Sequence, residues 1–433
     1  MDISSHSSDA RRIAVVLFLA QSFYSASTIA VFTLTPVIAA GLSGSDAAAG
    51  WPQTLTLACR AAFAYPLALM MDALGRRLAL GLGYGCAIVG ATVAMAGIAG
   101  GSFMVFLVGS ALLGMSRASS DQSRYVAAEV FPEARRAKVI GFIVFAGTLG
   151  AVGGPAVVPF SVRWAEELGF AGHTGPFVFA AVAMSICTAI VLLFLRPDPR
   201  ELARAVTAGH RAGDEDADHE DATHNDAAHG GDTVEGSSGK AVGVRSLPEI
   251  FRDPRVRLAL LSMALGYFVM AFLMVITPLH MDHHHHSTGA ISGVIMAHTL
   301  GMFGLSWLTG GLIDRFGRVE MIHAGAGVLA LGCVLAPLSL RVPVLGLALF
   351  LLGLGWNFAF IAGSSLLSDA LAAAERARVQ GITEGLVAVC AGTASLTVGY
   401  AFQRGDYLVV SGIGLALSLS LVGAALWLGR RGE

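Results

Sequence analysis

The sequence predicts an all-α integral membrane protein with twelve transmembrane helices, arranged as two six-helix bundles with both termini in the cytoplasm. Three observations predict this fold class: the composition, the lengths of the apolar stretches and an internal repeat. Hydrophobic side chains make up 55% of the 433 residues, charged side chains only 13%, and the mean hydropathy is +0.68. A soluble protein carries about 25% charged residues and could not bury this much apolar surface in one core.

Each predicted helix is an apolar stretch long enough to cross a bilayer core of about 30 Å, which takes about 20 residues. The twelve stretches are 13–40, 50–71, 78–100, 103–129, 138–160, 176–196, 256–279, 289–311, 320–340, 343–368, 379–402 and 407–428. Although Arg11 and Arg12 precede the first stretch, it is too long for the apolar region of a signal peptide. We therefore predict that this helix is retained.

The distribution of Lys and Arg predicts the orientation. With the N-terminus in the cytoplasm, all but six of the 28 Lys and Arg residues fall in cytoplasmic segments or termini, as the positive-inside rule requires. The six exceptions are Arg163, Arg341 and Arg404 on the outside, and Arg60, Arg117 and Arg124 within helices. We predict a multi-pass protein of the bacterial inner membrane, with the lipid bilayer as a partner. The net charge of −2 excludes a strongly basic nucleic-acid binder.

The longest gap between apolar stretches, 197–255, divides the chain. Its part 213–235 contains nine acidic residues and three His but no Lys or Arg, a composition that predicts disorder. The predicted units are therefore an N-terminal six-helix bundle (1–196), a largely disordered cytoplasmic linker rich in acids and His (197–255), and a C-terminal six-helix bundle (256–433). A solvated linker is the favoured interpretation of the middle unit, with metal buffering as the alternative.

The two predicted bundles repeat short motifs at nearly the same offset. Asp72 and Asp314 are 242 residues apart, and the similar runs that begin at Arg136 and Arg376 are 240 residues apart. Two related six-helix bundles are typical of secondary transporters. In both loops Gly permits a tight turn, while Asp and Arg can pair or cap helix ends, so we interpret them as gating loops. The alternative is a simple positively charged anchor. The residues concerned are Asp72, Gly75, Arg76, Gly310, Asp314, Arg315, Gly317 and Arg318.

The run Gly310-x-x-x-Asp314-Arg315-Phe316-Gly317-Arg318, its partial copy at 72–77 and the division into six plus six helices resemble the major facilitator superfamily. The resemblance covers essentially the whole chain. It implies the major facilitator fold and secondary active transport by alternating access. The first copy departs from the pattern, with Ala68 and Ala73 in place of Gly and Arg. An enzyme is not expected, because the sequence has no P-loop, G-x-S-x-G or H-E-x-x-H motif.

Two pairs of residues on the seventh and eighth predicted helices suggest a substrate. Met270 and Met274 are spaced i, i+4, as are His298 and Met302, so each pair is expected on one helix face. At 1.5 Å per residue, Met270 and His298 lie near the bilayer midplane, where transporter sites lie. Thioether and imidazole ligands suit copper(I). The alternative is that these Met residues only fill space in the helix packing.

The loop between these helices is external in the predicted topology and could gather a metal; the alternative is a solvated turn. It contains His280, Met281, Asp282, His283, His284, His285 and His286. Together with the Met and His pairs, it resembles the CcoA-type copper importers. This resemblance implies that Met270, Met274, His298 and Met302 bind copper, which is imported for respiratory haem–copper oxidase assembly. Copper would then be the cargo and not a cofactor, and a cytoplasmic or periplasmic copper chaperone would be a partner.

Other charged residues within the helices suggest proton coupling or structural pairing. Arg117 and Asp121 have i, i+4 spacing and are predicted to neutralise each other, while Arg60 and Glu384 are further coupling candidates. The leading function is copper import. The alternatives are a facilitator of an organic solute, such as riboflavin or a drug, and a non-transporting membrane metal sensor. The facilitator would use Arg60, Arg117, Trp51 and Trp356 to bind an anionic or aromatic substrate.

Overall fold

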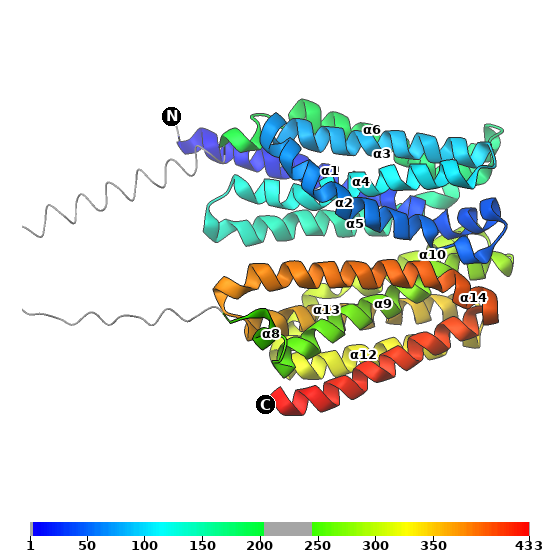
Figure 1. Ribbon diagram of the computed structural model, residues 1–433. Helices are drawn as coiled ribbons and strands as arrows, with labels where there is room; N and C mark the ends of the chain where they lie inside the picture. Colours follow the sequence, from blue (N-terminus) through cyan, green and yellow to red (C-terminus); the bar gives the residue numbers. More distant parts are fainter. Residues whose placement is uncertain (1–2, 203–244, 433) are drawn as a thin grey trace, which may run out of the picture.

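The computed structural model describes residues 3–202 and 245–432, and these are almost entirely helical, without a strand (Figure 1). The predicted linker falls largely outside the described residues. The first half contains α1 (Ile3–Ser43), the short helix η1 (Asp46–Ala48), α2 (Trp51–Leu74), α3 (Arg76–Ala99), α4 (Phe103–Glu129), α5 (Glu133–Glu167), η2 (Gly172–Thr174) and α6 (Gly175–Phe194). The second contains α8 (Leu247–Ile250), α9 (Pro254–His283), α10 (Thr288–Thr299), η4 (Leu300–Gly304), α11 (Ser306–Phe316), α12 (Arg318–Leu335), η5 (Ala336–Leu338), α13 (Val342–Ala370) and α14 (Ala373–Gly432).

The helices form two bundles that lie side by side, α1–α6 and α9–α14 (Figure 1). Three of the four buried apolar clusters draw their fully buried members from one half only, and the fourth joins α9–α14 to Ala40 and Ala49 of the first half. Large apolar side chains such as Trp307 and Leu408 instead face outward, 78% and 70% exposed, as expected where lipid surrounds the protein. The predicted all-helical fold is confirmed.

The number of spans follows from how the helices are broken. Ten described helices are long and apolar enough to cross a membrane, and the pair formed by α10–η4 and α11, bent by 45°, makes an eleventh. The long helix α14 contains two non-helical residues, Gly405 and Asp406, where it turns back on itself (Figure 1). Counting α14 as two passes, each of the twelve predicted stretches therefore corresponds to a helical segment.

Two predicted boundaries were wrong. The stretch 289–311, predicted as one helix, is interrupted by η4 and by Leu305, because the chain there adopts π-helical geometry. The helix α9 continues to His283, so half of the predicted outer loop is helical.

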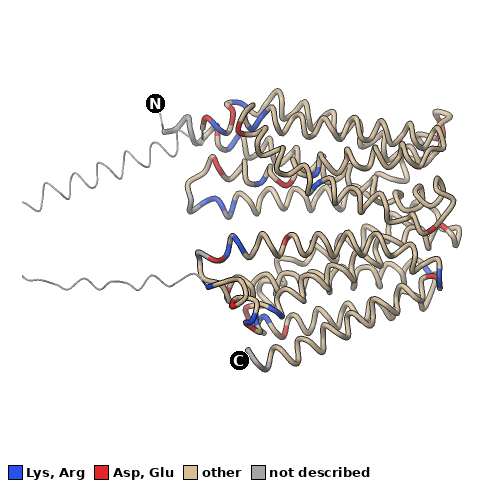
Figure 2. The backbone as a smooth tube through the Cα atoms, viewed as in Figure 1, with Lys and Arg blue, Asp and Glu red and all other residues tan. Residues whose placement is uncertain are grey.

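Both ends of the described chain lie at the same end of the bundle, here called the terminal end; the opposite, distal end carries η1 and residues 284–287 (Figure 1). Lys and Arg gather at the terminal end (Figure 2). That the terminal end faces the cytoplasm stays a prediction from the positive-inside rule.

A reporter fused after Glu433 tests this orientation. Because the basic residues gather at the terminal end, alkaline phosphatase fused there should be inactive and green fluorescent protein fluorescent. The same two reporters inserted after His285, at the distal end, serve as the control and should give the opposite result. Phosphatase activity after Glu433 would reverse the side assignments.

The two repeated loops have the same backbone conformation, which the glycines make possible. Gly75 between α2 and α3 has φ 89° and ψ 165°, and Gly317 between α11 and α12 has φ 92° and ψ 162°. Side chains other than Gly rarely adopt this conformation. The repeat seen in the sequence is therefore also a repeat of turn geometry.

The two halves meet closely at the distal end. The hydroxyl of Thr54 donates a hydrogen bond to the carbonyl of Gly392 at 3.2 Å, and His283 Nε2 lies 3.4 Å from a carboxylate oxygen of Asp46. A Cβ atom at Gly50 would overlap the carbonyl oxygen of Ser395, so the absence of a side chain at Gly50 lets α2 and α14 touch. These contacts join the two halves on the distal side of the molecule.

Candidate functional site

A cavity of about 230 Å³ lies between the two halves, halfway along the helices. It is much larger than a single ion needs, since a cavity that holds one water requires roughly 10–15 Å³. Its walls come from α1, α2, α3, α4 and α6 in the first half, and from α9, α10, η4, α13 and α14 in the second. A site near the middle of the membrane between two repeats is where secondary transporters bind their substrates.

The wall contributed by the first half is rich in hydrogen-bonding side chains. Its polar residues are Tyr24, Ser27, Thr28, Thr35, Gln53, Thr56, Ser110, Ser116 and Arg117. Several of the hydroxyls, such as Ser27 and Thr35, bond back to their own helix, which lets them lie within an apolar bundle. These hydroxyls already donate to backbone carbonyls, and their oxygens can still accept a hydrogen bond from a polar solute.

Arg117 is the cationic residue in this wall, and its predicted direct ion pair with Asp121 does not form. Asp121, one turn further along α4, pairs instead with Arg60 of α2, with Nε and Oδ2 2.6 Å apart. Tyr24, Asp121 and Tyr267 are electrostatic neighbours of Arg117, so Asp121 still acts on Arg117 although its ion pair is with Arg60. Because the direct ion pair of Asp121 is with Arg60, the guanidinium of Arg117 keeps its hydrogen-bond donors for a group in the cavity.

A second cavity, of about 220 Å³, adjoins the first, and both contain Arg117, Ile29 and Phe303 in their walls. This cavity is also lined by Gln21, Ser120, Asp121 and Arg124. The two cavities therefore meet at Arg117. The first cavity is the more apolar of the two, and the second is the more polar.

The wall contributed by the second half contains an aromatic cluster. The ring of Trp356 on α13 lies 5.9 Å from Tyr267, 6.1 Å from Phe303 and 5.1 Å from Phe360, measured between ring centroids. Trp356, Tyr267 and Phe303 line the cavity. The indole N–H of Trp356 is buried and, among the described residues, has no hydrogen-bond partner. This cluster offers ring faces for stacking and one donor for an acceptor on a ligand.

The four predicted copper ligands are divided by the structure. Met270, Met274 and Met302 line the cavity. His298 is fully buried but is not part of the cavity wall, and its Nδ1 lies 2.8 Å from the carbonyl oxygen of Leu349 on α13. The π-helical turn after Thr299 changes the helical phase, so the i, i+4 spacing of His298 and Met302 does not place both on the cavity face. Their role as copper ligands stays a prediction.

The His-rich segment lies at the distal end, away from the cavity. The ring of His280 stacks on Tyr407 with centroids 4.3 Å apart, and its Nδ1 lies 3.4 Å from Asp406. Met281 is fully buried, whereas His283, His284 and His285 are exposed. Across residues 3–202 and 245–432, no group of three or more His, Cys, Asp or Glu side chains is placed to hold a metal ion. Copper gathering by this segment has no support in these positions.

The predicted gating loops make ion pairs within each half. In the first loop Arg76 contacts Asp72 at 2.9 Å and Glu129 at 3.2 Å. In the second loop Arg318 contacts Asp369 at 2.8 Å, while Asp314 and Arg315 are exposed. The ion pairs therefore join the α2–α3 turn to the end of α4, and the α11–α12 turn to the end of α13. Glu384 on α14 is exposed and is not part of either cavity.

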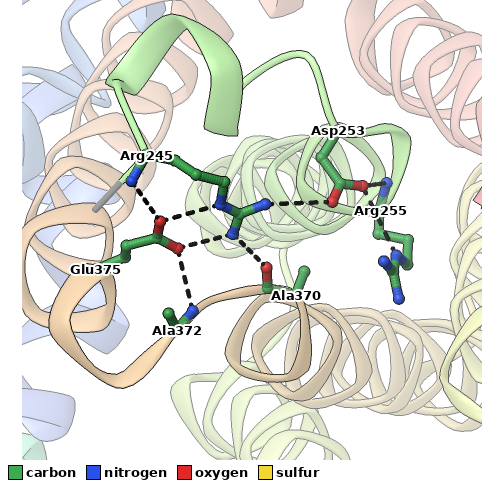
Figure 3. Close-up of polar contacts among 6 residues, drawn as sticks. All are labelled: Arg245, Asp253, Arg255, Ala370, Ala372 and Glu375. Atoms are coloured by element: carbon green, nitrogen blue, oxygen red, sulfur yellow. Dashed lines mark hydrogen bonds and ion pairs between the residues drawn. The ribbon is translucent and has the colours of Figure 1, made fainter. Parts of the chain in front are cut away.

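A denser polar network at the terminal end of the second half was not predicted (Figure 3). The Glu375 side chain, 1% exposed, accepts hydrogen bonds from the guanidinium of Arg245 at 2.7 and 3.0 Å, and from the backbone N–H of Ala372. Arg245 also donates to the carbonyl of Ala370. The bonds from Arg245 lower the pKa of Glu375 to about 2. This network fixes the chain that enters the second half to the start of α14.

Replacement of Glu375 by Gln should lower the thermal stability of the second half measurably, because Arg245 then loses its buried carboxylate. The pKa of Glu375 is lowered from 4.5 to about 2, so the stabilisation is complete above pH 4.5 and is lost only as the pH falls through about 2. The difference in melting temperature between the wild type and Glu375→Gln should therefore be the same from pH 5 to pH 8.

Thermal unfolding of the purified protein in detergent measures this. Arg255→Gln is the matched control, since Arg255 is 52% exposed and lies 3.7 Å from Asp253, an arrangement worth little. A Glu375→Gln melting temperature no lower than that of the control would contradict the prediction.

Comparisons with known proteins agree with this geometry. A family model described as the Major Facilitator Superfamily matches residues 17–395. The chain is 32% identical over 420 residues to the uncharacterized MFS-type transporter YdeG of Bacillus subtilis, covering 96% of this chain and 92% of that protein. It is 29% identical over 378 residues to the riboflavin transporter RfnT of Brucella anthropi, covering 87% of this chain and 85% of RfnT.

Solved structures show the same fold at low sequence identity. The nucleoside transporter NupG matches with a TM-score of 0.68 at 14% identity, covering 98% of this chain and 99% of NupG. A D-xylose–proton symporter matches with a TM-score of 0.67 at 14% identity, covering 95% of this chain and 96% of that chain.

Proposed function

Since this chain belongs to the Major Facilitator Superfamily, we propose that it is a secondary transporter for a planar aromatic solute that carries a polar, acceptor-rich group, with riboflavin as the first substrate to test. The observation that carries this proposal is the division of the central cavity. One wall presents the aromatic cluster around Trp356, and the opposite wall presents Arg117 and hydroxyl groups.

The chemistry of each wall fits one part of such a solute. A flat ring system stacks on Trp356, Tyr267 or Phe303, an interaction worth about 0.5–1.5 kcal/mol per aromatic pair beyond burial. Carbonyl, hydroxyl or anionic oxygens accept hydrogen bonds from Arg117, whose guanidinium has five donors and no acceptor. The second cavity, on the other side of Arg117, has room for a polar chain beside Gln21 and Ser120.

The likeness to RfnT supports this substrate class, because that protein is a riboflavin transporter and its alignment spans 87% of this chain. The residues around Arg117 also favour an organic solute over a metal cation. A fixed positive charge in the wall repels a cation, and Asp121, which could offset that charge, is already paired with Arg60 at 2.6 Å.

Copper import is a second candidate, favoured by the three Met side chains in the cavity wall, Met270, Met274 and Met302. Thioethers are suitable ligands for copper(I), and a carrier that must release its ion benefits from weak, neutral ligands. Under this alternative, copper is the cargo and supplies respiratory oxidase assembly, and the terminal end faces the cytoplasm of a bacterial inner membrane.

One uptake experiment separates the candidates. The protein is reconstituted into vesicles, and the uptake of labelled riboflavin and of copper(I) is measured separately for the wild type, Met270→Leu and Trp356→Ala. Under the proposed function, riboflavin enters, Trp356→Ala loses most of this uptake, and Met270→Leu retains it. Copper uptake that Met270→Leu abolishes, without riboflavin uptake, would establish copper import and overturn the proposal. Vesicles without protein give the background.

A further inference from the structure

The interrupted helix next to the cavity is hydrogen-bonded to Asn357 of the neighbouring helix α13. Helix α10 ends at Thr299, the π-helical segment η4 follows, and α11 begins at Ser306 with a bend of 45°. In this region the regular ladder of backbone hydrogen bonds is interrupted. Inside a membrane, backbone groups released in this way must find partners within the protein.

Asn357 on α13 supplies a partner for one of these backbone groups and for two hydroxyls of the following helix. Its side-chain N–H₂ donates to the carbonyl oxygen of Met302 at 2.6 Å and to the hydroxyl of Ser306 at 2.8 Å. Its side-chain carbonyl accepts a hydrogen bond from the Thr309 hydroxyl at 2.5 Å. Asn357 is only 1% exposed, so water does not compete for these bonds. A single amide thus bonds to the π-helical segment and to the first turn of α11.

Close packing keeps α13 near enough for these bonds to form. A Cβ atom at Gly301 would overlap the carbonyl oxygen of Phe350, and one at Gly353 would overlap that of His298. His298 adds a further tie through its bond to the carbonyl of Leu349. The two helices therefore touch through small residues and are joined by polar groups on both sides of the break.

The break determines which side chains face the cavity. Met302 and Phe303 belong to η4 and line the cavity, and Phe303 lies 6.1 Å from the ring of Trp356, the residue that precedes Asn357. In a continuous α-helix, the residues after Thr299 would lie at a different angle about the axis. The amide of Asn357 and the indole of Trp356 thus act on the same stretch of wall.

We propose that Asn357 is a positioning residue for substrate recognition: its amide holds the π-helical break, and the break places Phe303 beside Trp356 in the aromatic wall. This inference rests on the proposed function in so far as the central cavity is the substrate site. It assigns to Asn357 an effect on substrate affinity that passes through backbone geometry and not through contact with the substrate.

The test measures affinity and local backbone protection separately. Asn357→Leu removes both the donor and the acceptor, whereas Thr309→Val removes only the donor to Asn357. In reconstituted vesicles, Asn357→Leu should raise the KM for riboflavin about tenfold and change kcat less than about twofold, since tenfold corresponds to about 1.4 kcal/mol. Hydrogen–deuterium exchange in nanodiscs should become faster in the peptide 298–309. Thr309→Val should have smaller effects of the same kind, and Asn357→Gln, which keeps the amide, should restore part of the affinity.

The control is Thr277→Val, which removes another buried hydrogen bond, 2.7 Å to the hydroxyl of Tyr407, outside the cavity. It should leave the KM unchanged. An equal rise of KM in this variant, or unchanged exchange at 298–309 in Asn357→Leu, would overturn the inference. If the wild type takes up no riboflavin, the proposed function fails; faster exchange at 298–309 in Asn357→Leu would then still show that the amide of Asn357 holds the break.

Discussion

Replacing Arg117 by Gln should raise the KM for riboflavin by about tenfold to a hundredfold, because hydrogen bonds to a charged group contribute about 1.5–3 kcal/mol. Arg117 is half-buried between the two cavities, and the ion pair of Asp121 with Arg60 leaves Arg117 without a carboxylate in direct contact among the described residues. Gln keeps two donors but loses the charge and the fork geometry. Arg117→Lys keeps the charge alone and should lie between Gln and the wild type.

Uptake of labelled riboflavin into vesicles, over a range of concentrations, gives KM and kcat for each variant. Arg163→Gln is the control for a change in net charge. Arg163 lies near the end of α5 against the ring of Phe160 and lines neither cavity. If Arg117→Gln transports with the KM of the wild type, the polar wall is not part of the substrate site.

Gly50→Leu should reduce uptake to below about a tenth of the wild-type rate while the protein still inserts in the membrane. A Cβ atom at position 50 would overlap the carbonyl of Ser395, so α2 and α14 could no longer meet at the distal end. Overpacking of this kind costs about 1–3 kcal/mol, which shifts the protein away from the closed arrangement. A transporter that cannot close one end cannot complete its cycle.

The shift itself can be measured by labelling. Thr54→Cys, alone and combined with Gly50→Leu, is treated with a membrane-impermeant maleimide; labelling should be faster in the double variant because the larger side chain at position 50 separates α2 from α14. Gly41→Leu is the matched control, since nothing lies within 4 Å of a Cβ at that position. Normal uptake by Gly50→Leu would show that the distal contact is not part of the cycle.

The sequence predicts the helices well, because each span needs about 20 apolar residues and few other structures satisfy the backbone in lipid. It also predicts the repeated turns, since Gly75 and Gly317 share a motif whose geometry requires a positive φ. The break at 300–305 leaves no such mark: its residues are apolar or small, and its cause is Asn357, some fifty residues later.

The candidate site was harder to predict for the same reason. The i, i+4 spacing predicts a pair of Arg117 with Asp121, but this spacing describes contacts within one helix only. The residue that forms the ion pair with Asp121, Arg60, comes from α2. The aromatic cluster joins Tyr267, Phe303 and Trp356 from three separate elements. No local pattern in the sequence connects these three residues. Of the three, the sequence analysis identifies only Trp356, as a substrate-binding residue of the alternative organic-solute facilitator. Met270, Met274 and Met302 were found because residue type alone marked them.

The division of the cavity has a consequence for how the cycle is driven. When the halves separate, the ring-binding side and the polar side separate with them, so a solute in an open state touches only one of the two. Both sets of contacts form together when the halves approach each other as they do around this cavity, and a solute that makes both sets would favour this arrangement. A fragment that carries only the flat ring would occupy the aromatic side without favouring occlusion. Such a fragment should behave as a blocker that is not itself carried.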